Sequence, residues 1–159
     1  MQTDSRLSRM LHVLLHMARH DEPFTSQQIA KMLNTNAALV RRTMAGLRNA
    51  GYVSSINGRK GGWTISCNLE KVTLSDIYNA VGQPRLIALG IGTEGSQCAV
   101  EKSVMSILDK TFNEAEKLIH MRLMQITLAD VLNDFNIRCL EGGWTKNGPP
   151  QPIHINESE

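Results

Sequence analysis

The sequence of 159 residues has few cysteines, few aromatic residues and no long hydrophobic run. No apolar stretch approaches the roughly 18 residues that a membrane-spanning helix needs. Residues 1–6 lack the basic and then apolar pattern of a signal peptide. The three cysteines, Cys67, Cys98 and Cys139, are spread along the chain, which predicts neither a disulfide framework nor the paired ligands of a zinc module. We therefore expect a cytoplasmic protein with no membrane partner and no metal site.

Catalytic motifs are also missing, since the chain contains no G-x-S-x-G, no P-loop and no H-E-x-x-H. Cys98 and His120 could not act as a catalytic thiol–imidazole pair, because they would lie about six turns apart on one helix. That separation is too long for a hydrogen bond between the two side chains. His12, His16 and His20 share a helix face, and two histidines at this spacing can bind a metal, but we interpret them as a polar face. We predict that the protein is not an enzyme. A thiol-dependent enzyme using Cys98 is a further alternative, which full function of a Cys98→Ser variant would exclude.

The composition that is present is that of an ordinary globular domain, with 42% apolar and 20% charged residues. The net charge of +2 hides an asymmetry along the chain. Residues 1–65 hold nine Lys and Arg against three Asp and Glu, whereas residues 66–159 hold eight against twelve. A basic first half favours a polyanionic partner such as nucleic acid, although a basic face that is merely solvated would look the same.

Apolar spacing predicts three helices in the first third of the chain, at 5–20, about 26–33 and 37–49. Thr25 followed by Gln28 is a capping-box pattern, and Asn36 can cap the third helix. That helix carries Arg41 and Arg42 on the side opposite its apolar stripe. Gly46 lowers its helix propensity, which close packing against another helix would explain.

A β-hairpin is predicted next, with strands at 52–56 and 63–67 around the glycine-rich and basic tip at 57–62. Two short helices joined by a tight turn and followed by such a hairpin describe a winged helix-turn-helix. Its second helix fits the major groove of DNA, and the slender tip can bring Arg59 and Lys60 to phosphates or the minor groove.

The second half predicts further helices. A Thr73 capping pattern opens a short helix to about residue 81, and residues 84–98 read as a loop. A long helix at 99–124 follows, and Thr127 starts a last helix to about Phe135. The long helix has an apolar stripe that a small domain cannot cover, so we expect it to pair with a second copy of the chain. Packing within its own chain is the alternative.

Five stretches of this sequence resemble the Rrf2 family of bacterial transcriptional regulators, over about residues 2–135. They are the turn into the third helix, a match to the family's L-R-x-A-G-L-V stretch with Tyr52 at its second Leu position, a glycine-rich wing that ends in an aromatic residue, and matches to the family's two T-L-x-D-[IL] segments, the second of which ends in Val131. In that order they are Leu33–Val40, Leu47–Val53, Gly58–Trp63, and Val72–Ile77 with Ile126–Val131. The resemblance implies a homodimeric winged-helix regulator whose long helix crosses to the partner.

The departures from the family pattern are informative. Members that hold an iron–sulfur cluster carry three closely spaced cysteines in the loop before the long helix, whereas this loop has only Cys98. The chain therefore resembles the subgroup without a cluster, and we expect no cofactor. Many members place an arginine before the first wing glycine, where this chain has Asn57. Positions of the third helix that are often polar in the family hold Ala38, Arg41 and Arg42 here, so the operator sequence is not transferable.

The sequence thus predicts a mainly α fold with a small β-hairpin, a winged helix-turn-helix plus a long dimerisation helix. The expected parts are a DNA-binding domain at 1–82, an effector loop at 83–98, dimerisation helices at 99–138 and a flexible tail at 139–159. The predicted function is that of a homodimeric repressor of transcription, switched by a redox or small-molecule signal, with Cys98 near the long helix as the candidate sensor. The alternative is a dimeric interaction module of the same fold that does not bind DNA. The residues predicted to contact DNA are Asn36, Ala38, Arg41, Arg42, Arg48, Arg59 and Lys60.

Overall fold

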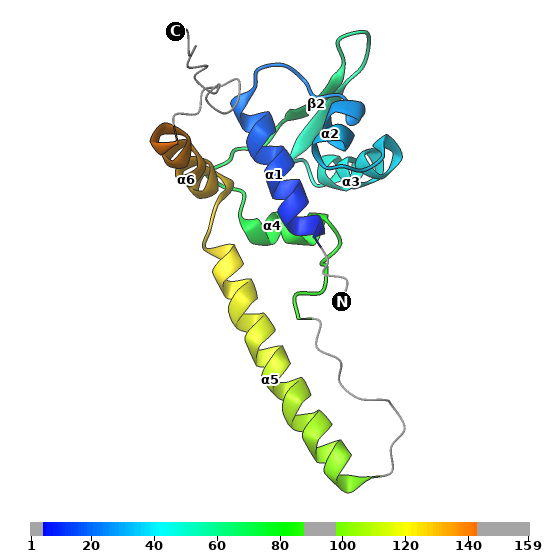
Figure 1. The fold of residues 1–159 in the computed structure, drawn as a ribbon, viewed down its shortest axis with the longest axis vertical. Helices are drawn as coiled ribbons and strands as arrows, with labels where there is room; N and C mark the ends of the chain where they lie inside the picture. The colour runs from blue at the N-terminus through cyan, green and yellow to red at the C-terminus, as the bar shows by residue number, and fades with distance from the viewer. Residues whose placement is uncertain (1–4, 88–97, 143–159) are drawn as a thin grey trace, which may run out of the picture.

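The computed structural model describes residues 5–87 and 98–142 (Figure 1). Its elements are α1 (Arg6–Arg19), α2 (Ser26–Met32), α3 (Ala37–Asn49), β1 (Val53–Ile56), β2 (Gly62–Ile65), α4 (Leu74–Ala80), α5 (Ala99–Met124) and α6 (Leu128–Glu141). The mainly helical fold with one antiparallel hairpin is therefore confirmed, as are the positions of its elements. None of the described helices is both long and apolar enough to cross a membrane. Residues 88–97, which make up most of the predicted effector loop, lie outside the described part of the chain.

Two predicted boundaries are wrong. The second strand ends at Ile65 and not at residue 67. The last helix does not end near Phe135 but continues to Glu141, and Cys139 on its final turn is buried. The helix ends where Gly142 follows, since glycine is a common residue at helix C-termini. Residues 139–141 therefore belong to α6 and not to the tail that we expected to begin at 139; the rest of that tail, from 143 on, lies outside the described residues.

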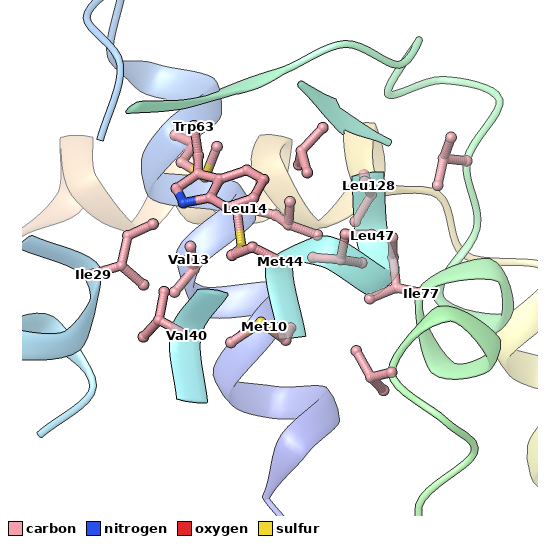
Figure 2. Packing of buried hydrophobic residues seen from close by; sticks show 14 of the residues in the cluster. Met10, Val13, Leu14, Ile29, Val40, Met44, Leu47, Trp63, Ile77 and Leu128 are labelled. Atoms are coloured by element: carbon pink, nitrogen blue, oxygen red, sulfur yellow. The ribbon is translucent and has the colours of Figure 1, made fainter. Parts of the chain in front are cut away.

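The hydrophobic core joins α1, the helix-turn-helix pair, the wing and α4 (Figure 2). The buried side of α1 packs against the apolar stripe of α3, and Ile77 enters from α4. Ile29 of α2 and Trp63 of β2 close the core on the side of the wing. The largest fully buried side chains are Leu14, Ile29, Met44, Leu47, Ile77, Leu128, Val13, Val40 and Val53.

Gly46 of α3 allows a close approach to α4. A Cβ atom at this position would lie 2.9 Å from the carbonyl oxygen of Ala80, at the end of α4. This distance is shorter than a real Cβ contact, and the atom that it meets belongs to the backbone. Close helix packing is therefore the reason for a glycine in the middle of this helix.

The two T-L-x-D segments lie side by side, which the sequence did not reveal. Thr73 and Thr127 form an isolated antiparallel bridge. The backbone N–H of Leu74 donates to Ile126 (2.9 Å), and that of Leu128 donates to Val72 (2.9 Å). Leu128 is 1% exposed and belongs to the core of the winged-helix part. The beginning of α6 is thus attached to the part of the molecule that holds α1 to α4 and the hairpin.

The helix α5 projects away from the rest of the molecule (Figure 1). It has 26 residues, which is about 39 Å at 1.5 Å per residue. Its C-terminal part meets α4, where the Tyr78 and His120 rings lie 5.9 Å apart. No residue of α5 is buried. Its exposed large apolar residues are Val100, Val104, Ile107, Leu108, Leu118, Ile119, Met121 and Met124.

Candidate nucleic-acid interface

The turn between α2 and α3 is held by side chains at both ends. The Thr25 and Gln28 side chains form the predicted capping box at the start of α2. Asn34 takes a left-handed conformation (φ 48°), which asparagine tolerates better than most residues. Asn36 then accepts a hydrogen bond from the Leu39 N–H (2.8 Å) and caps α3. The guanidinium of Arg9 in α1 donates to the Leu33 carbonyl at the end of α2, which ties the turn to the core.

The outer face of α3 is free of contacts with the core. Val40, Met44 and Leu47 are buried, which fixes the rotation of the helix about its axis. Ala38, Arg41 and Arg42 are consequently exposed, as predicted. These three, together with Asn36, form one exposed face at the start of α3. In helix-turn-helix proteins the first turns of the second helix are the part that usually contacts base edges.

The wing is a short hairpin with an exposed basic tip. Val53 pairs with Ile65 and Ile56 with Gly62, and the tip residues 57–61 join the strands. Gly58 has φ 108°, a conformation that L-residues rarely adopt. Its carbonyl accepts a hydrogen bond from the Gly61 N–H (2.9 Å), which closes the tip. Arg59 and Lys60 are exposed there, and their cationic groups can reach a phosphate backbone.

A hollow of about 330 Å³ separates the recognition helix from the wing. Polar groups from the start of α2 face residues of both strands across this hollow. Among the residues that the structure describes, Arg41 is the only charged one that lines it. Sequence reasoning missed the α2 residues, because a capping pattern locates a helix start but not the wing beside it. The lining residues are Thr25, Ser26, Gln27, Arg41, Ser55, Ile56, Gly61, Gly62 and Trp63.

Arg48 lies against the wing, at the far end of α3 from Asn36. Its Nη1 donates to the Ser55 hydroxyl at 3.5 Å, and its guanidinium carbon lies 5.9 Å from the centre of the Trp63 ring. The side chain is still exposed. The structure thus places Arg48 between α3 and the hairpin, apart from the first turns that carry Ala38 and Arg41.

The candidate sensor Cys98 stands at the first position before α5 and is exposed. The backbone N–H groups of Glu101 and, next, Val100 at the start of α5 hold the pKa of the Cys98 thiol below its usual value. A lower pKa increases the fraction of thiolate, which is the form that oxidants attack. The local geometry is therefore suited to a reactive thiol.

The other cysteines sit in different surroundings. Cys67, just after β2, is half-buried, and its burial raises the pKa of its thiol. Cys139 of α6 is buried and accepts a hydrogen bond from Arg19 (3.3 Å to Sγ). Within the described residues, no three His, Cys, Asp or Glu side chains are grouped so that they could hold a metal ion.

The predicted histidine face of α1 makes aromatic contacts. The His12 and His16 rings stack at 4.7 Å, and His16 meets the edge of Phe135 in α6 at 6.0 Å. Burial lowers the pKa of His16, and so does the charge of His12, His20 and Arg19. The sequence predicted a polar helix face near DNA or the partner chain, whereas the structure places His16 against α6 of the same chain.

Comparison with known proteins agrees with this architecture. The sequence model of the Rrf2 family, described as an iron-dependent transcriptional regulator, matches residues 3–134. YwnA of Bacillus subtilis (strain 168), which is named as a transcriptional regulator of the helix-turn-helix type, is 28% identical over 130 residues, covering 82% of this chain and 96% of YwnA. The protein rrf2 of Nitratidesulfovibrio vulgaris is 22% identical over 127 residues, covering 79% of this chain and 83% of that protein.

Solved structures share the fold. A transcriptional regulator from Lactobacillus plantarum superposes with a TM-score of 0.67 at 23% identity, covering 85% of this chain and 92% of its own. CymR of B. subtilis is described as the global cysteine regulator of that organism. It superposes with a TM-score of 0.54 at 23% identity, covering 84% of this chain and 97% of the CymR chain.

Proposed function

The chain belongs to the Rrf2 family of transcriptional regulators, and we propose that it is a homodimeric repressor that binds its operator through α3 and the wing. The observation that carries this proposal is the exposed surface made of the outer face of α3 and the basic wing tip, with Arg41, Arg42, Arg59 and Lys60 all reaching solvent. A helix of this kind fits a major groove, and the tip fits the adjacent backbone or minor groove. A regulator of this kind acts on DNA in the cytoplasm.

The homodimer is supported by α5. Its apolar side chains are exposed in the single chain, and Val100, Ile107 and Leu118 are each more than 60% exposed. Contiguous apolar surface of this kind marks an interaction site, and a second α5 presents the matching surface. A dimer would also supply two recognition helices, which can then read two half-sites about 34–36 Å apart or a multiple of that distance.

Two substitutions test the individual DNA contacts, and each is expected to change DNA affinity in a different way. We propose that Lys60 contacts phosphate, so Lys60→Ala should weaken binding evenly across sequences and reduce the salt slope by about one. Arg41→Ala should cost about 1–3 kcal/mol at particular base pairs if Arg41 reads base edges. Fluorescence anisotropy with a panel of duplexes measures both effects.

Lys102→Ala is the matched control for these variants, because Lys102 is exposed on α5, away from α3 and the wing. It should bind as the wild type does. If Arg41→Ala and Lys60→Ala both leave the binding profile untouched, the assignment of this surface to DNA is wrong.

We propose further that the chain works without an iron–sulfur cluster, although the family is described as iron-dependent. Such clusters are held by several cysteine thiolates, and residues 84–98 contain one, Cys98. Cys67 is half-buried beside the wing, and the Cys139 sulfur is engaged by Arg19. Iron analysis after anaerobic reconstitution should find no bound cluster, and a stoichiometric cluster would contradict this proposal.

The signal proposed for the switch is oxidation of the Cys98 thiol, because this thiol is exposed and its pKa is lowered. Hydrogen peroxide should weaken DNA binding by the wild type, and a thiol reductant should restore it. Cys98→Ser should be insensitive, whereas the control Cys67→Ser should respond as the wild type does. An equal response of Cys98→Ser to peroxide would place the sensor elsewhere, and a small-molecule effector would become the better explanation.

A further inference from the structure

Trp63 connects the wing to the first helix of the helix-turn-helix pair. It is 8% exposed, and its indole N–H donates to the Ser26 hydroxyl at 3.0 Å. Ser26 is the first residue of α2. The hydrogen bond therefore joins strand β2 directly to the start of the helix that precedes the recognition helix.

The backbone strengthens this connection. Trp63 and Phe24 form an antiparallel bridge, with N–H to carbonyl distances of 3.0 Å from Phe24 and 2.8 Å from Trp63. Gly62, the preceding residue, approaches so closely that a Cβ atom would lie 2.6 Å from the Phe24 carbonyl oxygen. The segment that leads into α2 thus acts as a short third strand along the wing.

The recognition helix is attached to the same side chain from the other direction. The Arg48 guanidinium of α3 lies over the Trp63 ring, and it also donates to Ser55 on β1. The indole ring therefore has α2 at its polar edge and α3 at its face. It also lines the hollow between the recognition helix and the wing.

From these contacts we propose that Trp63, through its hydrogen bond to Ser26, is a positioning residue that fixes the basic wing tip relative to α3. Lys60, in the wing tip, precedes Trp63 of β2 by only three residues. A change in how β2 sits on α2 will therefore move Arg59 and Lys60 relative to the groove that α3 occupies. The inference rests on the proposed DNA binding, and it gives Trp63 a role without any contact to DNA.

The test uses two variants that remove the two halves of one hydrogen bond. Trp63→Phe keeps an aromatic ring in the core but lacks the N–H, and Ser26→Ala lacks the acceptor at a half-buried position. Each should weaken binding to a duplex from the protein's own upstream region by about three- to tenfold, as the loss of one hydrogen bond implies. The double variant should lose no more than Trp63→Phe alone, and Ser26→Thr, which keeps a hydroxyl, should recover most of the affinity.

A second experiment distinguishes a role of Trp63 in positioning the wing from a general loss of protein stability. In the Lys60→Ala background the wing contact is already weakened, so Trp63→Phe should cost clearly less there than in the wild type. A purely structural role would give the same loss in both backgrounds, together with a loss of melting temperature that accounts for it. Tyr78→Phe, which removes a polar atom from a partly buried ring on α4, is the matched control and should bind as the wild type does.

The outcomes distinguish this inference from the function on which it rests. If the wild type shows no salt-dependent preference for the upstream duplex, the proposed function fails. If it shows that preference but Trp63→Phe and Ser26→Ala bind equally well, or if their losses are the same in the Lys60→Ala background, the positioning role of Trp63 is overturned.

Discussion

At the scale of the residue, helix caps were the most predictable features of this chain. The capping roles expected for Thr25, Thr73, Thr127 and Asn36 are all confirmed. Caps are local, because the side chain and the backbone N–H that it satisfies are only two or three residues apart. The partners of Arg48 and of Trp63 were not predictable in this way, since their contacts cross from one element to another.

Gly46 has a low helix propensity, yet it stands in the middle of α3 because α4 packs closely against it. Glycine disfavours helix by about 1 kcal/mol relative to alanine, so local propensity alone predicts that Gly46→Ala stabilises the protein. The structure predicts the opposite, because the new methyl group would meet the Ala80 carbonyl oxygen at 2.9 Å. We expect a destabilisation of about 1–3 kcal/mol, measured by chemical denaturation.

Asn133→Ala is a suitable comparison for this substitution, because Asn133 is exposed on α6. There, replacement with alanine should be neutral or slightly stabilising, as propensity suggests. A Gly46→Ala protein as stable as the wild type would mean that α3 and α4 can separate without cost, contrary to the packing described here.

At the scale of the element, helix positions followed from apolar spacing and caps, whereas the pairing of elements did not. The bounds of α3 and α5 agree with the predicted 37–49 and 99–124. The end of α6 was placed too early, because residues 136–141 contain no breaking residue and the glycine signal comes only at Gly142. The bridge between Thr73 and Thr127 could not be predicted, since neither segment carries a pattern that specifies its partner.

The apolar stripe of α5 gives the clearest prediction at this scale. Ile107 is 66% exposed in the single chain, and in the proposed dimer it would face the partner. Because a buried, unpaired carboxylate costs several kcal/mol, Ile107→Glu should weaken dimerisation by about 100-fold or more. Sedimentation should then show a 17.7 kDa monomer under conditions in which the wild type has twice that mass.

The control for this variant is Ser106→Glu. Ser106 is exposed on α5, opposite the apolar stripe, so the same new charge should leave the dimer intact. A wild-type protein that is monomeric at high concentration, or an Ile107→Glu variant that is still a dimer, would contradict the proposed interface.

At the scale of the whole molecule, the arrangement separates a compact basic head from a projecting helix. The head holds α3 and the wing on one surface, and α5 extends away from it (Figure 1). The start of α6 returns to the head, where Leu128 enters the core. In the proposed dimer, α4 and α6 are the elements that would connect the paired α5 helices to α3, because α5 contacts α4 and both α4 and α6 contact α1.

We propose that the exposed face of α3 and the wing tip bind DNA with sequence preference. The most direct measurement is fluorescence anisotropy of the reduced protein, titrated onto a duplex from its own upstream region and onto a scrambled duplex at several salt concentrations. We predict tighter binding to the upstream duplex, with log affinity falling by roughly 0.9 per phosphate neutralised for each unit of log salt. Binding that is absent, or that is independent of salt and equal for both duplexes, would contradict the account and favour an interaction module that retains the fold without binding DNA.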